Sequence, residues 1–204
     1  MTTIALFLLL PFAVVSARPV FAQAPALPDP AIEKPFRAEL AVDYSFLRSN
    51  APPGGCGCFN LNGGGAAFAW KVKPAQFALV ADVTVAHAGA ISNSGESLTL
   101  STFTAGMRYM PLIGHTRLKP YGQLLAGIAH SNGSLVEGSN PGAANAGAAF
   151  AANFGGGLDL RANHRFSLRL VEADYLLTTF DNGTNNHQNN LRLGAGIVVR
   201  FGCR

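Results

Sequence analysis

Apolar and polar residues alternate along much of the chain from position 37 onward. In the first such segment, Ala38, Leu40, Val42, Tyr44 and Phe46 share one face, and charged or small residues occupy the other. The same alternation returns in seven further segments, near residues 66–72, 77–85, 98–110, 118–130, 148–161, 165–179 and 190–201. A period of two that recurs in this way predicts eight amphipathic β-strands.

Two of these segments depart from simple alternation. The fifth is ambiguous in register, and the seventh changes phase between Arg169 and Glu172, which predicts a β-bulge at that point. The connections also alternate in length. Long polar connections follow the odd segments (Ser49–Asn62, Ala88–Ser97, Ser131–Gly147 and Asp181–Asn189), and shorter ones follow the even segments, such as Lys73–Gln76 and Ala162–His164. Long outer loops and short periplasmic turns are typical of a transmembrane β-barrel.

The composition agrees with an all-β chain whose outer surface does not face water. Of 204 residues, 49% are hydrophobic and only 13% charged, and the chain holds 23 Gly and 14 Phe. The length suits a single domain. The 15 basic residues are scattered singly, so no clustered patch favours nucleic-acid binding.

The N-terminal residues predict export. An apolar stretch runs from Ile4 to Val15, and small residues follow it up to Ala24. This pattern is typical of a secretory leader, because the stretch is too short for a transmembrane helix. We expect a cleaved signal peptide over 1–24, a Pro-rich periplasmic segment over 25–35 and an outer-membrane barrel over 36–204.

Hydrocarbon offers no hydrogen bonds to backbone amides, so a sheet inside a bilayer must close on itself. The predicted fold is therefore an eight-stranded antiparallel up-and-down transmembrane β-barrel. The polar strand faces then line a narrow interior that side chains fill. This expected lumen charge network consists of Glu39, Asp43, Lys71, Asp82, Arg108, Asp159, Arg161, Arg169, Glu172, Asp174, Arg192 and Arg200.

Unpaired charges in an enclosed interior are costly, so these side chains are expected to pair across the lumen and plug it. Because the first and last strands must join to close the barrel, Asp43 should lie near Arg192, and Glu39 near Arg200. A gated conductance that depends on switching such pairs is the alternative.

Aromatic residues gather near the strand ends, as in the girdles of membrane barrels. The expected girdle at the short turns consists of Trp70, Phe77, Tyr109, Tyr121, Phe166 and Phe201. Phe46, Phe150, Tyr175 and Phe180 are expected toward the loop rim.

Candidate chemistry is sparse. Cys56 and Cys58 lie in the first long loop and could form a local disulfide, although a bond this close in sequence is strained. His130 and Ser131 suggest a lipid-cleaving pair, but neighbours on a strand point to opposite faces and could not easily bond as base and nucleophile. The sequence predicts no enzymatic activity, no cofactor and no metal site.

The last predicted strand, residues 190–201, adds to a resemblance to a known family. Together with the leader and the eight amphipathic strands, it resembles the small outer-membrane barrels of the OmpA/OmpX type, and Gly196, Val199 and Phe201 fall where that family's assembly signal stands. The resemblance implies a location in the bacterial outer membrane, contact with lipids and lipopolysaccharide, and insertion by the barrel assembly machinery.

The resemblance and the pattern favour a structural or surface-interaction protein with a plugged lumen and four outer loops. The alternatives are a small gated channel, a barrel enzyme acting on lipid A, and a soluble lipocalin-like barrel that binds a ligand. The last alternative requires an apolar inside and a polar outside, the inverse of the assigned faces.

Overall fold

A computed structural model describes residues 36–49, 59–89, 97–113, 116–133, 147–180 and 186–202 of the chain. The leader expected over 1–24, the Pro-rich segment over 25–35 and the loop residues Cys56 and Cys58 lie outside these ranges. Among the described residues there is no helix of the length and apolarity needed to cross a bilayer.

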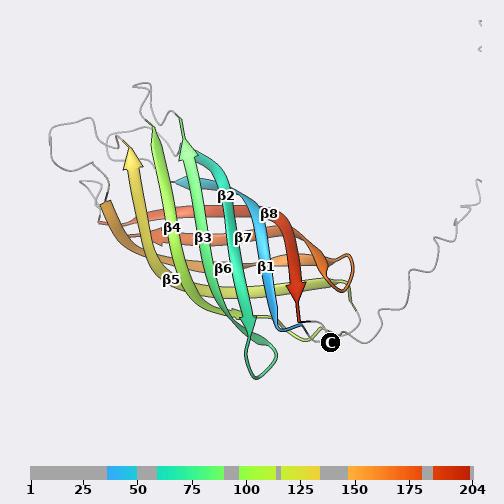
Figure 1. Ribbon diagram of the computed structural model, residues 1–204. Coiled ribbons are helices and arrows are strands. Elements are labelled where there is room, and N and C mark those ends of the chain that lie inside the picture. Colours follow the sequence, from blue (N-terminus) through green and yellow to red (C-terminus); the bar gives the residue numbers. More distant parts are fainter. Residues whose placement is uncertain are drawn as a thin grey trace, which may run out of the picture. The chain divides into compact units, whose positions relative to one another are not determined.

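Eight β-strands account for most of the described residues, and each pairs antiparallel with the next. They are β1 (Ala38–Ser49), β2 (Phe59–Lys71), β3 (Phe77–Ala88), β4 (Leu98–Tyr109), β5 (Leu118–Gly133), β6 (Gly147–Arg161), β7 (Phe166–Thr178) and β8 (Gln188–Phe201). Pairing of β1 with β8 closes the barrel (Figure 1). The predicted all-β fold and the closed eight-stranded barrel are confirmed.

The connections keep the alternation in length that the sequence predicts. Residues 50–58, 89–97, 134–146 and 179–187 separate the strands at one end, and residues 72–76, 110–117 and 162–165 separate them at the other. We call these the loop end and the short-turn end. The hairpin that joins β2 to β3 lies at the short-turn end, at the bottom of Figure 1.

The second strand begins earlier than the sequence predicts. The expected loop Ser49–Asn62 was too long, because β2 starts at Phe59 and pairs with β1 along its whole length. The intervening glycines do not interrupt the sheet. A Cβ on Gly63 would overlap the carbonyl oxygen of Val85 on β3, so this close approach of two strands requires glycine.

The predicted irregularity in the seventh strand is confirmed. The register of β7 against β8 shifts between Arg169 and Glu172, and Leu170 and Val171 between them are both exposed. A bulge of this kind places two consecutive residues on the outer face. It thereby turns Arg169 and Glu172 to the same inner face.

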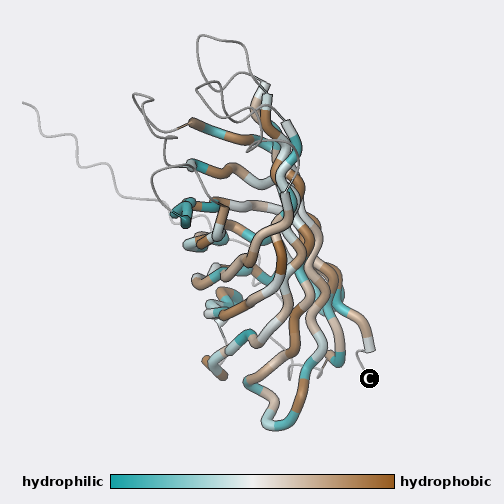
Figure 2. Tube along the Cα trace, turned by 90° about the vertical axis from the view of Figure 1, so that its left-hand side faces the viewer, coloured by the Kyte–Doolittle hydropathy of each residue, from teal (hydrophilic) through white to brown (hydrophobic). Residues whose placement is uncertain are grey.

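The outer and inner faces differ as the alternation requires. Large apolar side chains such as Val42, Leu79, Phe103, Leu124 and Ile197 are exposed on the outside. All six carboxylates that the structure describes are buried. Hydrophobic (brown) and hydrophilic (teal) positions are interspersed along the strands in Figure 2. A soluble ligand-binding barrel would show the opposite arrangement of faces.

A buried charge network as the candidate functional site

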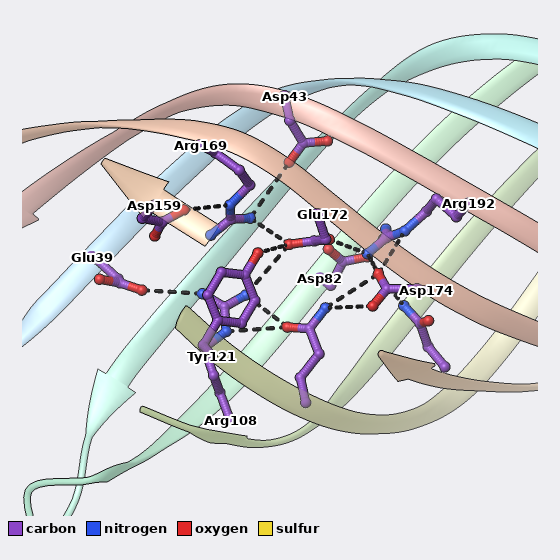
Figure 3. A network of polar contacts seen from close by, with 12 residues as sticks. Glu39, Asp43, Asp82, Arg108, Tyr121, Asp159, Arg169, Glu172, Asp174 and Arg192 are labelled. Carbon is purple, nitrogen blue, oxygen red and sulfur yellow. Dashed lines mark hydrogen bonds and ion pairs between the residues drawn. The ribbon is translucent and has the colours of Figure 1, made fainter. Parts of the chain in front are cut away.

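The middle of the lumen is filled by one network of polar side chains from seven strands. Each of its members is at most 8% exposed. Figure 3 shows most of them pointing toward one another. The members are Glu39 and Asp43 from β1, Asp82 and Thr84 from β3, Arg108 from β4, Tyr121 and Gln123 from β5, Asn153 and Asp159 from β6, Arg169, Glu172 and Asp174 from β7, and Arg192 from β8.

Glu172 is the centre of the network. One of its oxygens accepts hydrogen bonds from Arg169 Nη1 at 2.7 Å and from the Tyr121 hydroxyl, and the other accepts from Arg192 Nη2 at 2.5 Å. Arg108 Nη2 lies 4.0 Å away. A buried carboxylate is tolerable when its oxygens are satisfied by charged donors in this way. Glu172 therefore links three arginines from three strands.

Arg192 spans the lumen from β8. Its Nη1 donates to Asp82 at 2.9 Å and to the Thr84 hydroxyl at 2.6 Å. Its Nη2 and Nε donate to Asp174 at 2.6 and 3.1 Å. One guanidinium thus joins β8 to β3 and to its neighbour β7, and its planar fork of donors suits several acceptors at once.

Arg108 and Tyr121 form the second half of the network. Arg108 donates to Glu39 at 3.0 Å and to Gln123 at 2.7 and 3.1 Å. Its guanidinium carbon lies 4.2 Å from the centre of the Tyr121 ring, and that of Arg169 lies 4.9 Å from the same ring. Two cations over one ring favour a fixed position for Tyr121.

Tyr121 corrects the sequence prediction for the girdle. It was expected on the outer face at the short turns, but it points inward and is 7% exposed. The fifth segment was ambiguous because it carries small residues on both faces, so its alternation did not distinguish them. Space for the ring comes from Gly157, where an added Cβ would lie 2.5 Å from the Tyr121 hydroxyl oxygen.

The other residues of the expected short-turn girdle lie on the outer face. Trp70, Tyr109, Phe166 and Phe201 are each about half exposed, and Phe77 is partly exposed and packs on Tyr109 at 5.3 Å between ring centres. At the loop end, Phe46, Phe150 and Tyr175 lie outside, whereas Phe180 packs against a cluster inside the barrel.

Of the two ion pairs expected between β1 and β8, one has a different partner. Glu39 and Arg200 are direct cross-strand neighbours, with Oε2 and Nε 3.8 Å apart. Asp43 lies opposite Gly196, and its ion pair is with Arg169 Nη1 at 3.9 Å instead of with Arg192. The register is the reason, since Asp43 on β1 and Arg169 on β7 both lie opposite Gly196 of β8, which has no side chain to separate them. Arg169 Nε also donates to Asp159 at 3.1 Å.

Three expected network members lie at its edge, toward the short-turn end. Lys71 and Arg161 are the last residues of β2 and β6 and are only half-buried. The Lys71 ammonium lies 3.7 Å from the centre of the Phe36 ring. Arg200 is buried and lies 4.9 Å from the same ring. Across the twelve charged positions, six carboxylates and six cations balance formally.

An apolar cluster inside the loop end was not predicted. Leu47, Leu61, Leu98, Leu100 and Leu176 are buried in one cluster with smaller residues from the same strand ends. The alternation of residues assigns side chains to the outer or the inner face of a strand. It does not reveal that the inner face also becomes largely apolar near one end of the barrel. The lumen thus contains an apolar cluster with a few neutral polar side chains, such as Thr178 and Asn190, at the loop end, and charge in the middle.

The candidate pair His130 and Ser131 lies outside the charge network. His130 and Ser131 are neighbours on β5 with alternate exposure, as expected for side chains on opposite faces. In the described ranges, no group of His, Cys, Asp or Glu is arranged to hold a metal ion. Gln123, Asn153 and Thr84 join the network without having been singled out, because neutral polar residues give no signal apart from their inward position.

Known structures share this architecture although the sequence has diverged. No protein-family model matches the sequence, and no curated protein matches it. Neisserial surface protein A aligns with a TM-score of 0.57 at 14% identity, over 80% of this chain and 97% of that one. The fold is that of the small OmpA/OmpX-type outer-membrane barrels. Ail, the attachment invasion locus protein of Yersinia pestis, aligns with a TM-score of 0.52 at 16% identity, over 81% of this chain and 99% of Ail.

Proposed function

We propose that the chain is an outer-membrane barrel with a structural or surface-interaction role, exported by the leader over 1–24 and inserted with its apolar face in lipid. The exposed apolar belt carries this proposal. Side chains such as Leu79, Leu124 and Ile197 are more than half exposed, and so large an apolar surface is unstable in water but stable against acyl chains.

In this proposal the short turns face the periplasm and the four longer connections face outward. The barrel is then a rigid frame that presents loops, and the loops carry the recognition. By sequence the four long connections hold Glu96, Glu137 and Asp181 and no Lys or Arg. Ail has been crystallised with a heparin analogue, sucrose octasulfate. The acidic loops of this chain favour a neutral or cationic surface partner over a sulfated sugar.

The lumen is proposed to be plugged and not to conduct. Arg192 and Glu172 cross it in the middle with contacts of 2.5 to 3.1 Å, and the cluster of leucines narrows it further toward the loop end, beside the buried side chains of Thr178 and Asn190. An ion would have to displace several charge-assisted hydrogen bonds and then pass an apolar cluster. A gated channel is therefore less well supported, and no catalytic role is proposed.

The proposed partners are the lipids around the barrel, lipopolysaccharide on its outer side and the assembly machinery during insertion. Phe201 at the end of β8 is 47% exposed on the outer surface, where such machinery could contact it.

Cell fractionation and conductance test this proposal together. The full chain expressed in a Gram-negative host should sediment with outer membranes and should migrate differently on a gel before and after heating. Purified barrel added to a planar bilayer should give no stepwise current. Recovery in the soluble fraction without detergent would refute the membrane assignment, and steady unitary currents would refute the plug.

A further inference from the structure

The apolar belt on the outer face ends along β3, β4 and β5 as these strands approach the loop end. Its last exposed large side chains are Val85 on β3, Phe103 on β4 and Ile128 on β5. Beyond them, Ser101 and His130 lie opposite each other on β4 and β5. In a barrel inserted as proposed above, this change from apolar to polar side chains marks the level of the lipid headgroups in the outer leaflet.

A row of polar side chains crosses four neighbouring strands at this level. Asn62 on β2 lies opposite His87 on β3. His87 in turn lies opposite Thr99 on β4, and Thr99 lies opposite Asn132 on β5. We call these four residues the polar row. Thr99 is partly exposed and the other three are exposed, on strands that lie side by side in Figure 1. Because neighbouring strands are about 4.8 Å apart, the row is roughly 14 Å long.

Hydrogen bonds along the polar row orient its side chains. The Tyr44 hydroxyl donates to Asn62 Oδ1 at 2.6 Å, so the amide NH2 group of Asn62 can donate to another partner. His87 Nδ1 and Thr99 Oγ1 lie 3.0 Å apart, which leaves the second ring nitrogen of His87 for a further contact. The row therefore presents oriented donors and acceptors on the outside of the barrel.

The polar row is neutral in composition, since it contains no Lys, Arg, Asp or Glu. Among the described residues, Arg48 on β1 is the one exposed Lys or Arg at the loop end, and its Nη1 donates to Asn60 at 3.2 Å. Phosphate groups are bound best by the charged donors of Arg and Lys. Hydroxyl groups of a sugar both donate and accept, as amide, hydroxyl and imidazole groups do. The chemistry of the row therefore suits a sugar better than a phosphate.

We propose that the polar row binds the sugar headgroup of a glycolipid in the outer leaflet. Ser101 and His130 supply further contacts on the side of the row that faces the belt. The acyl chains of the same molecule then lie against the exposed side chains of Phe103 and Ile128. A sugar free in solution gains nothing from this belt, so the ligand is a lipid. The proposal rests on the outer-membrane location proposed above and names a partner for the outer surface of the barrel.

Native mass spectrometry tests the site on the barrel purified from host membranes in an uncharged detergent, with rough lipopolysaccharide as the probe. Wild type should bind a first molecule saturably, and chemical removal of the phosphates from the probe should change the affinity by less than about threefold. The double variant Asn62→Ala/Asn132→Ala should bind at least about tenfold more weakly, because it loses hydrogen bonds at both ends of the row.

Two control variants separate the row from the rest of the loop end. Asn189→Ala is the matched control for Asn62→Ala, because Asn189 on β8 accepts from the Tyr175 hydroxyl at 2.5 Å and is also exposed. It should stay within about twofold of wild type, as should Arg48→Gln, whereas Asn62→Ala alone should lose about threefold or more. A heat-dependent gel shift checks that each variant is folded.

Absence of saturable binding by the folded wild type would overturn the site and leave the membrane location intact. Equal losses in Asn62→Ala and Asn189→Ala would also overturn it, since they would indicate general attraction at the loop end. A large loss on removal of the phosphates, or in Arg48→Gln, would assign recognition to charge and contradict a sugar site. Recovery of the chain in the soluble fraction would refute the location and the site together.

Discussion

Replacement of Glu172 by glutamine removes the central charge of the lumen without changing its shape. The carboxylate binds Arg169 at 2.7 Å and Arg192 at 2.5 Å, and both guanidinium groups would remain buried with one acceptor charge fewer. Removal of one partner from a buried ion pair costs about 3–5 kcal/mol. The amide oxygen of Gln still accepts from one arginine, so we expect about 3 kcal/mol, or roughly a hundredfold in the unfolding equilibrium.

Urea unfolding in lipid vesicles measures this loss, with the emission of the single tryptophan, Trp70, as the signal. Asp43→Asn is the matched control, because this carboxylate is equally buried but lies 3.9 Å from its arginine. We expect the control to lose about 1 kcal/mol or less. Equal losses in the two variants, or no loss in Glu172→Gln, would refute the claim that Glu172 organises the network.

Three further substitutions test other parts of the barrel by the same unfolding assay. Gly157→Ala should cost about 1–3 kcal/mol, because the added Cβ would lie 2.5 Å from the Tyr121 hydroxyl, and a double-mutant cycle with Tyr121→Ala should show losses that are not additive. Val83→Arg, on the outer face of β3, should cost about 2–4 kcal/mol in a bilayer, and a cost near zero would contradict contact with lipid. Leu176→Ala should cost about 2–5 kcal/mol if the leucine cluster is packed, and its conductance should stay at zero while the charge network persists.

Much of the fold could be predicted because the two-residue alternation of apolar and polar positions determines most of the strands. In β1, β3, β4 and β8 the alternation is regular, and the eight strands, the alternate connection lengths and the bulge near Arg169 follow from it. The start of β2 could not be found in this way, since Asn and Gly are turn residues in most contexts. At Gly63 the reason for glycine is the carbonyl of Val85 on the next strand, a contact that no local pattern contains.

The charge network was predictable in membership but less so in its contacts. The alternation identifies Asp43 and Arg192 as inward-facing, yet the partner of Asp43 depends on the strand register, which places Asp43 and Arg169 opposite the same residue, Gly196. Tyr121 was misplaced because small residues flank it on both faces of β5. The inner leucines, such as Leu61, were missed because a hydrophobic side chain is equally compatible with lipid outside and with an apolar cluster inside.

Quenching of Trp70 tests most directly the claim that the apolar face of the barrel contacts lipid. Trp70 is half exposed on the outer face near the end of β2, and no other tryptophan contributes to the signal. In vesicles, lipids with bromine on the upper part of the acyl chain should quench its emission strongly, and aqueous acrylamide should quench it far less than in the unfolded chain. Quenching by acrylamide as in the unfolded chain, with no effect of brominated lipid, would contradict the account.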